Sequence, residues 1–518
     1  MSLGLVLLIG FALRLPTFGR TLLSSDEAAY SAIAEAMQRG AVLYRGIVDH
    51  KPPAIYDVYL VSFRVLGPYD TQLAHAAVVL AALLVAFALA RAAGRLYRDG
   101  RAGWVAALLF VVFSTTLPDF DALAANCELF LLAAQAVAFA WLVGEVENRP
   151  VLGWRTLFGV GLLTGVSVAF KYQGATFLAV AGTAVTLEAW SRRRTVGAAL
   201  AALLVVLAGT LVVPALYLAR AWVDGAAGSL WFWFLFNFRY IDGGPRALEA
   251  LRLGLVRTAL VGTAAFLPYA FGLAGTWRAM RDWWRRGLSG AGRPGPRLAG
   301  RVLAAAWLAG SVIALVPGRR FFGHYFLLVL PALCLLATGP LLAFWDRHRR
   351  LRPAVALLVV VPAAVALSVS TVLHAAVMDR LDPKPPFAEV ASRLRQLSGP
   401  DDSLFVWGHS VELYDLSRRT AGTRFVFCDY LTGTSPGTPS QSGVEDPTPN
   451  IVPESWDMLL DDLDRRQPRL LVDLAPAGWN SYDRFPISRY PRLERYVRAH
   501  YRERARVDGV VVYQRILP

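Results

Sequence analysis

The sequence is organised around SSDEAAY at Ser24–Tyr30, followed by DHKPPAIY at Asp49–Tyr56. This stretch lies between the first two long apolar segments of the chain. It carries two adjacent carboxylates, a segment with helical periodicity, and then a histidine and a lysine in front of two prolines. The stretch is therefore either a functional loop on a membrane scaffold or a solvated connector.

The composition around this stretch is that of a membrane protein. Of the 518 residues, 55% are hydrophobic and only 18% are charged, whereas soluble domains carry about 25% charged residues. The apolar runs approach the roughly 20 residues that a helix needs to cross a bilayer, and they are too long for barrel strands. We expect eleven spans, at about residues 3–16, 73–96, 103–117, 122–144, 155–170, 174–190, 195–221, 254–276, 301–317, 323–345 and 354–376.

The arginines indicate how these spans are oriented. The even-numbered loops, together with the adjoining ends of the spans, contain twenty arginines, whereas the short odd-numbered loops contain only Lys171, Arg319 and Arg320. Basic residues accumulate on the cytoplasmic side, so we expect a cytoplasmic N-terminus and an outer face that includes the first loop, residues 17–72. The net charge of +15 lies mostly in these loops and not on a basic face with stacking aromatics, so the sequence indicates no nucleic-acid partner.

The last part of the chain differs in kind. Its pattern predicts helices at Phe387–Leu397, Trp456–Leu463 and Leu493–Tyr501, and strands at Ser403–Trp407, Arg424–Phe427, Leu470–Asp473 and Val510–Tyr513. Strands that alternate with helices are typical of a small α/β domain. We therefore divide the chain into a transmembrane domain, residues 1–376, and a soluble α/β domain on the outer face, residues 377–518.

Asp26 and Glu27 have two interpretations. A carboxylate on an outer-face loop can take the proton from an acceptor hydroxyl or amine. Equally, Ser25, Asp26 and Glu27 are typical of a helix N-terminus and can simply cap a helix over Glu27–Arg39. The interpretations are compatible, because a cap also fixes a side chain in place.

The DHKPP segment also has two interpretations. The double proline makes the backbone extended and stiff, so that Lys51 is held as a point charge suited to a phosphate. The alternative is a rigid turn whose lysine reaches toward lipid head groups.

Further ionisable residues stand in the other outer-face loops. Asp119 and Asp121 occupy the turn between the third and fourth spans, where they can bind a divalent ion, orient an acceptor or cap a helix. As a metal signal Asp-x-Asp is weak, so the sequence predicts no firm metal site. A cationic group follows, which suits an anionic head group or an anchoring lipid phosphate, and comprises Lys171, Arg319, Arg320, His324 and Tyr325. The aromatic run at Trp231–Tyr240 predicts an interfacial helix or the border of a lipid-chain groove.

Together these motifs resemble the GT-C glycosyltransferases, specifically the bacterial relatives of the protein O-mannosyltransferases and of the lipid A aminoarabinose transferase. The resemblance covers the whole chain. It rests on Asp26–Tyr30, on His50–Pro53, on Asp119 and Asp121, on Phe170–Gln173, on Gly323–Tyr325 and, in the tail, on Val406–His409 and Asp429–Gly433.

The resemblance implies a GT-C type polytopic α-helical protein of the bacterial cytoplasmic membrane. Its activity would be an inverting transfer of a hexose or pentose from a polyprenyl-phosphate donor to a lipid, glycan or protein acceptor, in the synthesis of lipopolysaccharide or another cell-envelope glycan. The partners would be this donor, the acceptor and membrane lipids. No cofactor would be required, and a divalent metal at Asp119 and Asp121 is the alternative.

The resemblance also implies roles for individual residues. Asp26 would be the base, with Glu27 sharing that duty, and Lys51 would approach the donor phosphate. The other residues would bind the donor phosphate (Lys171, Arg319, Arg320 and His324) or orient the acceptor or a metal (Asp119, Asp121, His50 and Tyr325). The alternative function is a lipid-linked-sugar flippase without transferase activity. Against it, the ionisable residues gather on one face, and the hydropathy pattern contains no inverted repeat.

Overall fold

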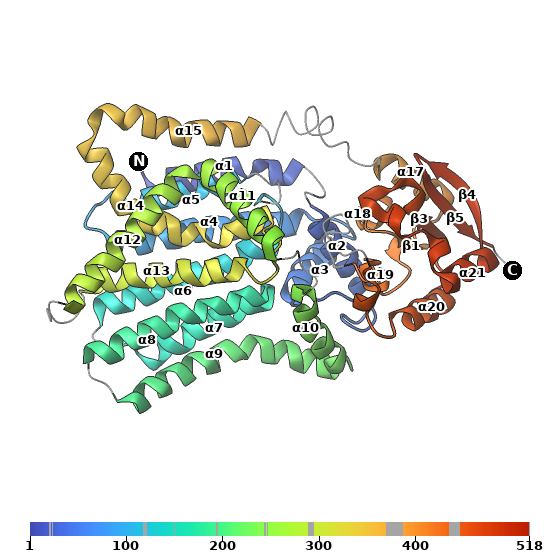
Figure 1. The fold of residues 1–518 in the computed structure, drawn as a ribbon, viewed down its shortest axis with the longest axis horizontal. Coiled ribbons are helices and arrows are strands. Elements are labelled where there is room, and N and C mark those ends of the chain that lie inside the picture. Colours follow the sequence, from blue (N-terminus) through green and yellow to red (C-terminus); the bar gives the residue numbers. More distant parts are fainter. Residues whose placement is uncertain are drawn as a thin grey trace. The chain divides into compact units, whose positions relative to one another are not determined.

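The computed structural model describes residues 1–19, 22, 24–117, 122–149, 151–192, 195–242, 245, 247–288, 295–368, 387–434 and 446–516. The chain packs into two units (Figure 1). The helical unit comprises Met1–Arg20, His75–Ala219 and Arg252–His374. The loop–tail unit comprises Thr21–Ala74, Arg220–Leu251 and Ala375–Pro518. The boundary predicted at residues 376 and 377 lies outside the described residues and stays a prediction.

Long apolar helices make up the helical unit. Helices suit a bilayer because each satisfies its own backbone polar groups. They are α1 (Leu3–Leu13), α4 (Gln72–Leu96), α5 (Ala102–Phe113), α6 (Cys127–Asn148), α7 (Trp154–Phe170), α8 (Leu178–Arg192), α9 (Val196–Val223), α11 (Ala247–Ala264), α12 (Phe266–Leu288), α13 (Pro296–Leu315), α14 (Leu330–Arg347) and α15 (Arg352–Ser368). Among the described residues, five helices are long and apolar enough to cross a membrane, or six if one bent pair counts as a span. Several apolar helices are thus confirmed, and the count of eleven stays a prediction.

The span expected at residues 254–276 is wrong as a single helix. The chain breaks between α11 and α12, and the two helices are bent by 104°. Pro268 lies in the first turn of α12, where a missing N–H is tolerated, whereas it would interrupt a continuous helix. The span expected at 323–345 likewise opens as a 3₁₀ turn, Gly323–Leu328, and becomes α14 only at Leu330.

Small residues let these helices approach closely. A Cβ atom added at Gly275 of α12 would lie 2.0 Å from the carbonyl oxygen of Leu336 in α14. A Cβ atom at Gly165 of α7 would lie 2.3 Å from the carbonyl oxygen of Thr210 in α9. Such contacts are typical of helix pairs in membranes, where small residues allow backbones to pack against each other.

The loop–tail unit begins with two helices in the first loop, α2 (Ser25–Gln38) and α3 (Ala54–Leu66). The helix expected at Glu27–Arg39 is confirmed, as is a helix over the aromatic run, α10 (Ala227–Asp242). Helix α3 is not predicted from the sequence. The double proline suggests only a rigid turn, but Pro53 is the N-cap of α3, a position where its restricted backbone suits a helix start.

A small sheet forms the core of the C-terminal domain, in the order β2-β1-β3-β5-β4. Strand β1 (Ser403–Trp407) pairs in parallel with β2 (Thr420–Ala421) and β3 (Leu470–Asp473). Strand β5 (Val510–Arg515) is antiparallel to β3 and to β4 (Tyr501–Val507). The helices of the domain are α17 (Phe387–Leu397), α18 (Glu412–Ser417), α19 (Asp429–Thr432), α20 (Ser455–Arg466) and α21 (Pro491–His500).

Three of the four expected strands are confirmed. The strand expected at Arg424–Phe427 is wrong, because this segment makes only an isolated bridge, from Phe425 to Val48 of the first loop. Strand β4 is not predicted, since its sequence YRERARV is rich in arginine. Its position at the sheet edge explains the arginines, because charged side chains protect an exposed edge from pairing with another chain.

The close packing of α12 on α14 leads to a test with a matched pair of substitutions. We expect Gly275→Ala to lower the thermal unfolding midpoint of the detergent-solubilised protein, because overpacking typically costs about 1–3 kcal/mol. Gly182→Ala in α8 is the control, since a Cβ atom there meets nothing within 4 Å. That control should be neutral or slightly stabilising, as alanine is the better helix former. Equal effects of the two substitutions would contradict the α12–α14 contact.

Candidate functional site

The first loop places Asp26 and Glu27 at the start of α2. The Ser24 side chain accepts a hydrogen bond from the Glu27 backbone N–H at 3.2 Å, so that Ser24, one residue before the predicted cap, is the N-cap. Both carboxylates lie in the first turn, where the helix dipole favours negative charge. The predicted helix start is therefore confirmed, whereas the cap is Ser24 instead of Ser25, and this cap fixes the direction in which the two carboxylates leave the helix.

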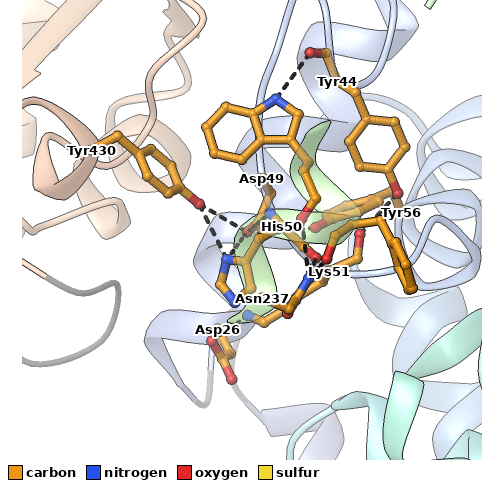
Figure 2. Close-up of polar contacts among 10 residues, drawn as sticks. Asp26, Tyr44, Asp49, His50, Lys51, Tyr56, Asn237 and Tyr430 are labelled. Atoms are coloured by element: carbon orange, nitrogen blue, oxygen red, sulfur yellow. Dashed lines mark hydrogen bonds and ion pairs between the residues drawn. The ribbon is translucent and has the colours of Figure 1, made fainter. Parts of the chain in front are cut away.

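Asp26 forms an ion pair with Lys51. The Lys51 Nζ atom lies 2.7 Å from Asp26 Oδ1 (Figure 2). It also lies 4.7 Å from the centre of the Tyr30 ring. The Asp26 side chain is 32% exposed and that of Lys51 is 16% exposed, so the pair can be reached from outside the protein. The sequence suggests separate tasks for these residues, whereas the structure brings them into direct contact.

Glu27 has a different environment from its neighbour. It is completely buried, and the Tyr59 hydroxyl donates to its Oε1 atom at 3.3 Å. The exposed and buried carboxylates of this motif are therefore not equivalent. Asp26 is the one that can meet a substrate, and a shared duty of Glu27 stays a prediction.

Asp49 anchors the segment that carries Lys51. Its buried carboxylate accepts hydrogen bonds from the His50 N–H at 2.6 Å, the Tyr56 hydroxyl at 2.7 Å and the Tyr430 hydroxyl at 3.2 Å. The His50 Nδ1 atom lies 3.2 Å from the same Tyr430 hydroxyl (Figure 2). Burial alone would raise the pKa of Asp49, but the charge of Lys51 and the bonds from His50 and Tyr56 hold that pKa well below its ordinary value.

Helix α10 and the tail complete this support. Asn237 donates to the His50 carbonyl at 2.9 Å, and the Trp233 indole donates to the Tyr44 carbonyl at 3.2 Å. The Tyr430 ring packs against Trp233 at a centroid distance of 4.8 Å. Three segments that are distant in sequence thus fix the backbone around the buried His50.

A second polar cluster lies in the helical unit. Glu128, in the first turn of α6, is buried and forms an ion pair with Lys171. The Lys171 Nζ atom is 4.0 Å from the centre of the Tyr325 ring, and His324 Nε2 is 3.8 Å from Glu128 Oε1. Arg320 is also buried. The structure therefore brings together three of the predicted cationic and aromatic residues around a carboxylate.

The structure separates the predicted site residues into two groups. Asp26, Glu27, His50 and Lys51 belong to the loop–tail unit, whereas Lys171, Arg319, Arg320, His324 and Tyr325 belong to the helical unit. Arg319 lies in a tight turn with a positive φ of 51°. Asp119 and Asp121 lie outside the described residues. Within the described ranges, no group of three or more His, Cys, Asp or Glu side chains is arranged to hold a metal ion.

Sequence reasoning misses several members of these networks. The roles of Asp49, Tyr56, Glu128, Asn237 and Tyr430 are not predicted. The acid directly before His50 is a signal for Asp49, because a carboxylate beside a histidine often orients it. No local pattern indicates Tyr430, which lies 381 residues from Asp49.

The apolar helices, the structured first loop and the small C-terminal sheet match the fold of solved ArnT and oligosaccharyltransferase structures. ArnT from Cupriavidus metallidurans, bound to undecaprenyl phosphate, aligns with a TM-score of 0.57 and 16% identity over 99% of this chain and 97% of that one. The Archaeoglobus fulgidus oligosaccharyltransferase in complex with Zn and sulfate aligns with a TM-score of 0.52 and 15% identity over 99% and 73%. The archaeal oligosaccharyltransferase AglB from the same organism, in complex with an inhibitory peptide and a dolichol-phosphate, aligns with a TM-score of 0.51 and 14% identity over 100% of this chain and 74% of that one.

No protein-family model and no curated protein matches the sequence. At these identities the likeness to solved structures concerns the fold. At that level the resemblance to GT-C proteins is confirmed.

The Asp49 network leads to a prediction about stability and pH. We expect Asp49→Asn to lower the thermal unfolding midpoint near pH 7, because hydrogen bonds to a charged group contribute about 1.5–3 kcal/mol. The folded-state pKa is depressed, so this contribution is complete above the ordinary value of about 4 and is lost as pH falls through the folded-state value. The midpoints of wild type and variant should therefore converge below about pH 4.

Asp57→Asn is the matched control in the same loop. Asp57 forms a partly exposed pair with Arg220 at 2.9 Å, and such pairs contribute little. A variant of Asp49 that behaves like this control would contradict the anchoring role.

Proposed function

We propose that this protein is an inverting membrane glycosyltransferase. It transfers a sugar from a polyprenyl-phosphate donor to a lipid, glycan or protein acceptor at the outer face of a bacterial cytoplasmic membrane. The observation that carries the proposal is the accessible Asp26–Lys51 pair at the start of α2, in a chain with the GT-C fold. The partners of the solved structures, undecaprenyl phosphate in ArnT and dolichol-phosphate with a peptide in AglB, support this class of donor and acceptor.

The ion pair suggests the state of Asp26 and Lys51 before the donor binds. Each member neutralises the other, which avoids an uncompensated charge next to the membrane. The phosphodiester of the donor is an anion that competes with Asp26 for Lys51. When Lys51 turns to the phosphate, the Asp26 carboxylate is released toward the acceptor.

The transfer then follows from these two charges. The acceptor oxygen or nitrogen attacks the sugar C1 from the face opposite the phosphate, and the bond from C1 to the phosphate oxygen breaks. The electron pair of that bond stays on the phosphate, whose second negative charge Lys51 stabilises. Asp26 takes the proton that the acceptor loses. The configuration at C1 is inverted, and the products are the glycosylated acceptor and polyprenyl phosphate.

The cluster of the helical unit supplies further donor ligands in this proposal. Lys171 repeats the pattern of Lys51, a lysine paired with a carboxylate and placed over a tyrosine ring. We assign Lys171, Arg319, Arg320 and His324 to the donor phosphate. Tyr325, His50, Asp119 and Asp121 would orient the acceptor, and the last two are the candidates for a divalent ion.

The proposed orientation rests on the alternation of arginines between loops. It places the N-terminus in the cytoplasm and the C-terminal domain outside, with the first loop on the same face as that domain. A cysteine introduced into the C-terminal domain should therefore react with a membrane-impermeant reagent in intact cells. Labelling only after lysis would contradict this orientation.

The function is tested with purified protein and a radiolabelled polyprenyl-phosphate sugar. We expect wild type to transfer the label to an acceptor extract and Asp26→Asn to be at least about 100-fold slower, the usual range for loss of a general base. Asp57→Asn is again the control, and it should keep the wild-type rate. The same assay with EDTA tests for a metal requirement. Unchanged activity would rule out a functional divalent ion at Asp119 and Asp121.

Two results would contradict the proposal. If Asp26→Asn transferred sugar at the wild-type rate, Asp26 would not be the base. Movement of the intact donor across vesicle membranes without its consumption would favour the flippase.

A further inference from the structure

The C-terminal domain contains a His–Asp pair that the roles above do not use. His409 follows β1, and Asp429 begins α19. The His409 Nδ1 atom lies 2.6 Å from Asp429 Oδ2. Asp429 is completely buried, and its other oxygen accepts from the Thr434 hydroxyl at 3.0 Å and the Tyr482 hydroxyl at 3.4 Å. The carboxylate therefore fixes the imidazole with Nδ1 toward Asp429, and Nε2 is the ring nitrogen left for proton exchange.

The His409–Asp429 pair lies near the carboxyl end of β1, a position at which α/β sheets commonly bind ligands. Strand β1 pairs in parallel with β2 on one side and with β3 on the other. The chain runs from β1 to β2 on one side and then crosses back to β3 on the other, so the strand order reverses at β1. In open α/β sheets the carboxyl end of such a strand is the usual place for ligands. His409 lies two residues beyond that end.

The backbone facing His409 is strained. Asn480 and Ser481 have positive φ angles of 52° and 61°. The Asn480 side chain donates to the His409 carbonyl at 2.5 Å and to the Ser410 hydroxyl at 3.2 Å. Non-glycine residues in this conformation cost free energy and concentrate at functional sites.

Helix packing within the loop–tail unit connects this pair to Asp26. Helix α2 packs against α18, and the Ser31 hydroxyl donates to Asp415 Oδ2 at 2.6 Å in a buried contact. Helix α18 begins three residues after His409. The carboxylates that act electrostatically on His409 include Asp429 from α19, Glu412 from α18 and Asp26 from α2. Burial disfavours the imidazolium, but these carboxylates outweigh it and raise the pKa of His409 above its ordinary value.

We propose that His409 receives the proton that Asp26 takes from the acceptor, with Asp429 as its positioning residue. This inference rests on the proposed function. After transfer, the Asp26 carboxyl gives its proton through solvent to Nε2 of neutral His409. The imidazolium, stabilised by Asp429, then gives that proton to bulk water through its 11% exposed side chain. The step moves only a proton and changes no oxidation state. Asp26 becomes a carboxylate again and re-forms its pair with Lys51.

The test is the pH dependence of kcat/KM for sugar transfer. Wild type should lose activity at acid pH, where the imidazolium cannot accept a proton. His409→Gln should be at least about tenfold slower, as expected when a proton-transfer group is lost, and should lack this acidic limb. Asp429→Asn should move the limb to lower pH, because the carboxylate that favours the imidazolium is gone. KM for the donor should stay unchanged in both variants.

Controls separate this role from a structural one. His500→Gln, in α21 of the same domain, should keep the wild-type rate and pH profile. If His409→Gln does not fold, the inference is tested by the acidic limb of the kcat/KM pH profile in the folded Asp429→Asn or Thr434→Val variant. A folded His409→Gln enzyme with the wild-type rate and acidic limb, or an unshifted limb in Asp429→Asn, would overturn the inference and leave the proposed function intact. A wild-type protein that transfers no sugar would instead overturn the proposed function.

Discussion

The ion pair between Asp26 and Lys51 is the interaction on which the proposed site in the first loop depends. Its two members stand at the ends of the segment 26–51 within the first loop, 25 residues apart, and meet at 2.7 Å. The Ser24 cap fixes the first end. The second end is held by two prolines and by the Tyr44 hydroxyl, which donates to the Lys51 carbonyl at 2.8 Å. A short, accessible pair between two rigid supports can open for an anionic ligand and close again without reorganising the loop.

The tail of the chain is part of that support. Tyr430 donates to Asp49, and the Val48 N–H donates to the Arg424 carbonyl at 3.0 Å. Arg424 is in turn held by Asp462 of α20 at 2.9 Å. A first loop without these partners would have to bury Asp49 with fewer hydrogen bonds, and a buried charge with fewer partners is costly. The C-terminal domain therefore contributes to the geometry of the first loop, in addition to the proton-accepting role that we propose for His409.

Much of the local structure follows from the sequence. The periodicity predicts α2, the aromatic run predicts α10, and the apolar runs predict β1, β3 and β5. The break between α11 and α12 is not predicted, since the residues on both sides of it are apolar. Helix α3 is missed because a proline pair is compatible with a turn and with a helix start alike.

The site is predicted only in part, and the reason is distance along the chain. Asp26, His50 and Lys51 stand out by residue type, since ionisable groups near a membrane are costly and seldom accidental. Their partners are set by tertiary packing: Tyr430 lies 380 residues from His50, and Glu128 lies 43 residues from Lys171. Charge patterns can place these residues on one face of the membrane, but only the folded chain shows which of them meet.

The central claim is that Lys51 leaves Asp26 for the phosphate of the donor. The most direct measurement is the affinity of purified wild type, Asp26→Asn and Lys51→Gln for undecaprenyl phosphate, determined by calorimetry in detergent. We expect Asp26→Asn to bind at least as tightly as wild type, because Lys51 is released. We expect Lys51→Gln to bind at least about tenfold more weakly, since a charge-assisted hydrogen bond is lost. Unchanged binding by Lys51→Gln, or loss of binding by Asp26→Asn, would contradict this exchange of partners by Lys51.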